Sequence, residues 1–169
     1  MTKFRPSLFV FAVLVVAGFC LAQGQSRRTP PQAPQKSAHV MITPADVKWG
    51  PGPPSLPPGA ELAVLSGDPG KAGGTFTIRA KFPAGYKVPP HWHPTDENVV
   101  VVSGTMMFGQ GTKFDEAVMH ESPAGTFALM PRGMRHFAMA KEESVVQIYG
   151  TGPFAINYVN PADDPRKAK

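Results

Sequence analysis

The chain has 169 residues, a formal net charge of +5 and a single cysteine, Cys20. This length is sufficient for one domain with a hydrophobic core. The weak, scattered positive charge argues against a nucleic-acid-binding groove, and a single cysteine excludes an intramolecular disulfide.

The first 22 residues have the pattern of a secretory signal peptide. A short basic start precedes the apolar run 8–19, which is shorter than the roughly 20 residues of a membrane span. Small residues at the end of the segment allow cleavage after Ala22. We therefore expect an exported protein, periplasmic or secreted, that has no cysteine once processed. Two alternatives stay open: a retained membrane anchor, and lipidation of Cys20, for which the preceding Phe19 is bulky.

Residues 23–40 predict a disordered linker. The segment is rich in Gln, Pro, Ser and Arg and has too little apolar surface to order itself. His39, at its end, is expected to be solvated. Residues 49–59 contain five prolines and three glycines, so this stretch is expected to lie extended over the domain that follows.

Residues 41–160 are predicted to form a single all-β domain. Alternation is clearest in 74–82, where every second residue is apolar. Residues 114–121 allow either one turn of helix or a strand, and 161–169 read as a charged tail. Short strands bounded by Gly and Pro, with no sustained helical period, indicate a β-sandwich or barrel. The expected strands are 61–68, 74–82, 97–104, 104–109, 125–131, 135–140, 144–150 and 154–159.

A cluster of possible metal ligands stands between these strands. On a strand, His91 and His93 point to one side and Trp92 to the other, while neighbouring prolines hold the backbone extended. Glu97 follows a bend, and Asp96 is expected to point away. Two imidazoles and a carboxylate suit a borderline divalent metal.

A second segment supplies a further histidine. His136 begins an alternating strand after a turn at residues 131–133. If this strand pairs with the first, the site has three histidines and one glutamate.

Together these residues resemble the two motifs of the cupin superfamily. The first motif is matched by Gly85, His91, His93, Glu97 and Gly104. The second is matched by Gly125, Pro131, Gly133 and His136, with Ala140 where the family has Asn. The resemblance covers roughly residues 60–158 and implies a small jelly-roll β-barrel.

The same resemblance implies metal ligation by His91, His93, Glu97 and His136. The family's Asn is not a ligand, so Ala140 leaves metal binding intact and should make the pocket roomier and more apolar. The ligand set does not distinguish Mn, Fe, Ni, Cu and Zn. His120 has no partner motif and is expected to be exposed rather than a fifth ligand.

A metal bound by three imidazoles and a carboxylate keeps coordination positions open for water, O₂ or substrate. The leading hypothesis is an exported, metal-dependent enzyme of dioxygenase or oxidase type acting on a small organic molecule, with isomerisation as a lesser option. Glu97 could act as acid or base if it leaves the metal.

The alternative is a non-enzymatic module that binds or senses a metal or small ligand, by analogy with anti-sigma factors that carry cupin-like zinc domains. A storage protein is a weaker third reading, because such chains usually have two domains. The valine run 99–102 is apolar on both faces and so needs cover, which the extended segment 40–60 or a partner subunit could supply. Of the two, we expect a homodimer. Apart from small molecules and a second copy, no partner is expected. Membrane contact would come only through an uncleaved signal segment.

Overall fold

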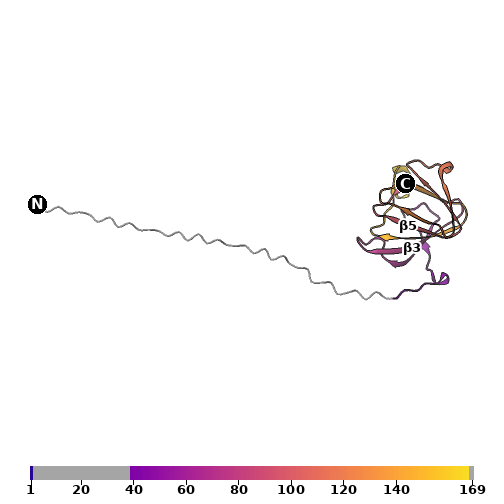
Figure 1. Ribbon diagram of the computed structural model, residues 1–169, viewed down its shortest axis with the longest axis horizontal. Helices are drawn as coiled ribbons and strands as arrows, with labels where there is room; N and C mark the ends of the chain where they lie inside the picture. Colours follow the sequence, from indigo (N-terminus) through magenta and orange to yellow (C-terminus); the bar gives the residue numbers. More distant parts are fainter. Residues whose placement is uncertain (2–38, 168–169) are drawn as a thin grey trace. The chain divides into compact units, whose positions relative to one another are not determined.

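The computed structural model describes Met1 and residues 39–167, and the domain in this second range is built from antiparallel strands (Figure 1). The first sheet, in the order of its strands, contains β1 (Gly50–Pro51), β2 (Glu61–Gly67), β3 (Thr75–Phe82), β10 (Ser144–Thr151), β5 (Glu97–Ser103) and β8 (Phe127–Met130). The second contains β11 (Asn157–Tyr158), β4 (Lys87–Trp92), β9 (His136–Ala140), β6 (Thr105–Gln110) and β7 (His120–Pro123). The all-β, jelly-roll prediction is confirmed.

The only helices among the described residues are single 3₁₀ turns. They are η1 (Pro44–Asp46), η2 (Glu116–Val118), η3 (Pro161–Asp163) and η4 (Pro165–Lys167). None of them is long and apolar enough to cross a membrane. The expected signal peptide, and the expected linker up to residue 38, lie outside the described residues.

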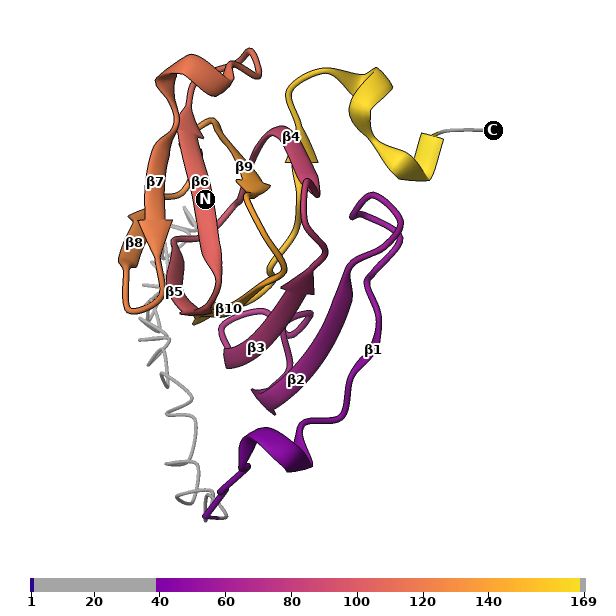
Figure 2. The ribbon, with the colours of Figure 1, turned by 90° about the vertical axis from the view of Figure 1, so that its right-hand side faces the viewer.

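The core lies between the two sheets, and in Figure 2 strands β2 and β3 of the first sheet are on the right, whereas β6 and β7 of the second are on the left. The alternation in β3 places Phe76, Ile78, Ala80 and Phe82 inward, each at most 5% exposed. In β5, Val99 and Val101 are buried, whereas Val100 is half-buried and Val102 exposed. One face of the valine run therefore fills the core, and the other forms part of the outer surface.

Two stretches differ from their expected form. Residues 114–121 make both predicted structures in succession, because η2 is followed directly by β7. The expected strand at 154–159 shrinks to the two residues of β11. In the residues before β11, the ring of Phe154 and the carbonyl of Ala155 contact the site instead of pairing with a neighbouring strand, as described below.

The proline-rich stretch 49–59 pairs with β2 only through β1. Beyond β1 it is held by two tyrosine hydroxyls, since Tyr86 donates to the carbonyl of Pro57 and Tyr158 donates to that of Ser55. Burial raises the pKa of Tyr158 to about 12, so this hydroxyl keeps its proton at neutral pH. The stretch lies against the domain through these contacts, but it is not extended throughout as expected, because turns at 54–55 and 58–59 interrupt it.

Candidate metal centre

The two prolines of β4 set the direction of the first histidine. Strand β4 pairs with β9 at Val88 and again at His91, and the register shifts between these two points. Pro89 and Pro90 occupy the shift, where they have no N–H to donate to the ladder. The irregularity breaks the alternation, so Pro90 and His91 are both buried. His91 and His93 then face the interior, while Trp92 is half-buried on the other side.

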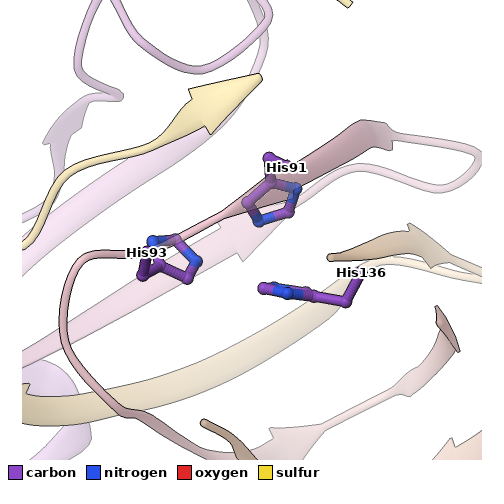
Figure 3. A group of neighbouring side chains, drawn as sticks. All are labelled: His91, His93 and His136. Carbon is purple, nitrogen blue, oxygen red and sulfur yellow. The ribbon is translucent and has the colours of Figure 1, made fainter. Parts of the chain in front are cut away.

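Strand pairing delivers the third histidine. His136 is the first residue of β9 and lies directly opposite His91 in the ladder. In Figure 3 the rings of His91, His93 and His136 turn toward a common point. Their centroids are 4.2 Å apart for His91 and His136, and 5.2 Å apart for His93 and His136. One ring nitrogen from each histidine lies within 4.8 Å of the others.

Backbone carbonyls fix the tautomer of all three rings. The Nδ1 atoms of His91, His93 and His136 lie 2.7, 2.8 and 3.1 Å from the carbonyl oxygens of Pro89, Ala155 and Met134. A carbonyl only accepts hydrogen bonds, so each Nδ1 carries the proton. In the neutral ring the lone pair is then on Nε2, the atom that can bind a metal.

Burial keeps His91 neutral. Desolvation, followed by the charges of His136 and His93, lowers the pKa of His91 to about 3. At neutral pH this imidazole therefore offers a free electron pair without first having to lose a proton.

Glu97 closes the cluster from the other sheet. Its Oε2 lies 3.2 Å from Nε2 of His93 and 3.3 Å from Nε2 of His136. Burial alone would raise the pKa of Glu97, but contacts with His136 and His93 outweigh burial and hold it well below the usual range. The carboxylate is thus ionised at neutral pH. Its ligation of a metal stays a prediction, because the three-nitrogen group forms without it.

One buried nitrogen of the site lacks a partner in the described part of the chain, and a bound cation would supply one. Nε2 of His93 is buried and, despite its short distance to Glu97, has no hydrogen-bond partner of suitable direction among the described residues. A buried, unpartnered lone pair beside an ionised carboxylate is unfavourable unless a proton or metal lies between them. The donor set and this orphaned atom both fit a divalent ion, so the three buried histidines could hold one.

A segment that the sequence did not single out supports His93. The ring of Phe154 stacks on the imidazole at 4.5 Å between centroids, with 17° between the planes. The next residue, Ala155, provides the carbonyl that orients the same ring. The carbonyl of Ile156 accepts a hydrogen bond from Arg166, which forms a 2.7 Å ion pair with Asp164. The charged C-terminal tail is thus attached to the backbone beside the site.

The histidines and Glu97 open onto a cavity of about 220 Å³. Apart from these four residues, its lining is almost wholly apolar. The principal members are Leu56, Leu62, Ile78, Phe82, Val88, Val99, Met106, Phe108, Met130, Ala138, Val146, Ile148, Phe154 and Ile156. Ala138 contributes to the lining, but Ala140 is buried beyond it in the core.

The other candidate residues lie outside the cluster. His120 is exposed on β7, and His39 is exposed as well. Asp96 points away from the metal group, as expected, and accepts a 2.8 Å hydrogen bond from the backbone N–H of Arg132. The guanidinium of Arg135 lies 5.7 Å from the ring centre of Trp92, so Trp92 has a surface contact rather than a place in the site.

Several solved structures share this fold. A polyketide cyclase, RemF, from Streptomyces resistomycificus has 17% identity and a TM-score of 0.59, covering 77% of this chain and 92% of that one. A putative acetylacetone dioxygenase from Methylibium petroleiphilum has 20% identity and a TM-score of 0.59, covering 78% and 88%. KdgF from Halomonas has 16% identity and a TM-score of 0.52, covering 68% and 96%. At these identities the likeness shows the fold alone.

Comparison with curated proteins gives no significant match. A family pattern, in contrast, matches most of the chain, since the ChrR cupin-like domain covers residues 37–155. This range contains both histidine motifs, every residue that lines the cavity except Ile156, and all but one, β11, of the eleven strands in the described residues. The chain is a member of the ChrR cupin-like domain family and hence of the cupin superfamily.

Proposed function

We propose that the protein is a metal-dependent oxidoreductase, of dioxygenase or oxidase type, that acts on a small organic molecule. The observation that carries this proposal is the convergence of His91, His93 and His136 on the wall of an apolar cavity. A purely structural metal would not need a neighbouring cavity. Three imidazoles leave positions open at a metal, and a redox-active ion there would supply O₂ activation.

The protein's own groups have distinct parts in such a reaction. The Nε2 atoms of the three histidines would hold the metal, and the carbonyls behind them keep the rings in place. Glu97 is the only carboxylate among the described residues that line the cavity, so it is the group available to move a proton at Oε2. The apolar walls keep water away from reactive species.

A metal-by-substrate screen tests the proposal. Metal-free protein is loaded separately with Mn, Fe, Ni, Cu and Zn, and O₂ consumption is followed with phenols, diketones and small organic acids. Activity should appear with a redox-active metal and vanish in His136→Ala, whereas His120→Ala should keep it because His120 is exposed. Equal loss in both variants, or no consumption with any metal and substrate, would contradict an oxidoreductase function.

A non-enzymatic binding module is the second candidate. It is favoured by the cavity lining, which offers no ionisable side chain beyond the four residues of the cluster in the described part of the chain. In that case the protein should retain zinc through gel filtration, bind a small ligand and consume no O₂. Zinc retention combined with ligand binding but no turnover would select this candidate over the enzyme.

Export and dimer formation are further proposals. Export is supported by the N-terminal pattern of residues 1–22, and N-terminal sequencing of the mature protein should begin at Gln23. A homodimer is supported by the edge strand β8, where Phe127 and Leu129 are 55% and 49% exposed. Light scattering should give twice the chain mass for the processed protein and half of that value for Phe127→Glu.

A further inference from the structure

We infer that the cavity is built for an uncharged molecule with an apolar body and one polar, metal-binding end. This inference rests on the proposed function and specifies its substrate class. It begins with charge: among the described residues that line the cavity, none is Lys or Arg. Besides the four residues of the metal cluster, the only polar side chain in the lining is Ser55.

The cationic side chains near the site are engaged elsewhere. Arg135, next to His136 in the chain, donates to the carbonyl of Gly133 and covers Trp92. Lys87, at the start of β4, forms a 2.6 Å ion pair with Glu116. A substrate carboxylate lying in the cavity away from the metal would therefore lose its water and gain no counter-ion, which is strongly unfavourable.

The strand register places the apolar wall directly beside the metal cluster. Val99 lies two residues beyond Glu97 on β5, and Ala138 lies two beyond His136 on β9, so each pair shares a face. Val99, Ile148 and Ile78 are aligned across β5, β10 and β3. A molecule bound to the metal through a polar end would thus lay its other end against these side chains.

The volume of the cavity limits the size of the ligand. An apolar protein cavity of about 150 Å³ accommodates benzene, so a cavity of about 220 Å³ has room for a single ring or a short branched chain with a few added atoms. Ala138 contributes to this space with a single methyl group. A larger side chain at position 138 should fill part of the cavity without contacting the Nε2 atoms of the three histidines.

Two hydroxamates with the same metal-binding head test the inference. 4-Methylpentanohydroxamic acid ends in an isopropyl group, and succinic acid monohydroxamate ends in a carboxylate of the same number of non-hydrogen atoms. Titration calorimetry with zinc-loaded protein should show the isopropyl compound binding roughly tenfold tighter or more. Equal affinities, tighter binding of the carboxylate, or no binding of either compound would overturn the inference.

Two variants examine the wall itself. Ala138→Leu should weaken the binding of the isopropyl compound by roughly tenfold at unchanged zinc content. Ala124→Leu, in an exposed turn, should leave this affinity unchanged. Leu56→Arg introduces a cation at a half-buried position of the lining. This change should reduce the difference in affinity between the isopropyl compound and the carboxylate compound. Unchanged affinities in both Ala138→Leu and Leu56→Arg would place the ligand outside the cavity.

A metal-free arm separates this inference from the proposed function. Benzene and benzoate are offered to metal-free protein and followed by NMR shift changes of the Ile78 and Ile148 methyl groups. Shifts with benzene and none with benzoate support the apolar cavity even if the protein shows no oxidase activity. Shifts with benzoate, or with neither, overturn the inference whatever the metal-loaded protein does.

Discussion

The metal-free protein should lose stability as the pH falls, and His91 should account for much of the loss. The ordinary pKa of 6.5 drops to about 3 in the folded protein, mainly because the ring is buried. The unfolded chain therefore binds the proton more readily than the folded protein. The stability linked to neutral His91 is complete above pH 6.5 and is lost as the pH falls toward 3.

The size of this effect follows from the same pKa difference. Each pH unit inside the window removes about 1.4 kcal/mol of the free energy of unfolding, so the whole window corresponds to about 4 to 5 kcal/mol. Glu97, whose pKa is held below the usual value of 4.5, acts in the same direction. Its contribution is present above pH 4.5 and is lost at lower pH.

Urea unfolding of metal-free protein between about pH 7 and pH 4 measures this slope. In His91→Gln the slope should decrease by about 1.4 kcal/mol per pH unit, because the titrating ring is gone. His120→Gln, at an exposed position, should retain the full slope. An identical slope in wild type and His91→Gln would show that the buried imidazole is not the source and would refute the reasoning.

Three other predictions concern the metal and the fold. His136→Ala should weaken zinc binding by at least about a hundredfold in chelator competition, and wild-type affinity would argue against His136 as a ligand. Phe154→Leu removes the ring stacked on His93 and should lower the free energy of unfolding by about 0.5–1.5 kcal/mol. It should also increase the rate of zinc release; an unchanged rate would show that the stacked ring stabilises the fold without affecting the metal. Gly104→Ala should destabilise more than Gly85→Ala in urea, because both positions have positive φ but only at Gly104 would the new methyl clash with a carbonyl oxygen, that of Glu143. Equal losses would show that backbone strain alone matters.

The cluster residues were predictable because their spacing is local. His91 and His93 alternate with Trp92, and the prolines around them restrict the backbone whatever the rest of the chain does. The alternating apolar residues of β3 likewise identify their own inward face. Where a segment lacks such a repeating pattern, prediction was weaker: 154–159 was expected to be a strand, but only 157–158 form one, and the segment contacts the site through the ring of Phe154 and the carbonyl of Ala155.

The role of Ala140 shows the limit of reasoning from alternation. Positions 136, 138 and 140 share a face of β9, which suggested that both alanines enlarge the pocket. Only Ala138 lines the cavity. Ala140 lies opposite Met106 and exchanges backbone hydrogen bonds with Tyr86 and Gly85, so it belongs to the closed end of the core. Whether a residue on the inner face of a strand lines the cavity or packs in the closed core depends on the side chains that contact it from the other sheet.

From its sequence alone, this protein can be recognised as an all-β chain with a signal-like start and a small set of side chains that could bind a metal, since residue type and local spacing determine those features. The carbonyls that orient His91 and His136 are also local, because each lies two residues before its histidine. The tertiary structure decided that His136 lies opposite His91, that the carbonyl of Ala155 orients His93, and that the site faces an apolar cavity lined by no cationic side chain of the described residues. These features depend on strand register and on contacts between residues far apart in the chain, and no local pattern encodes either of them.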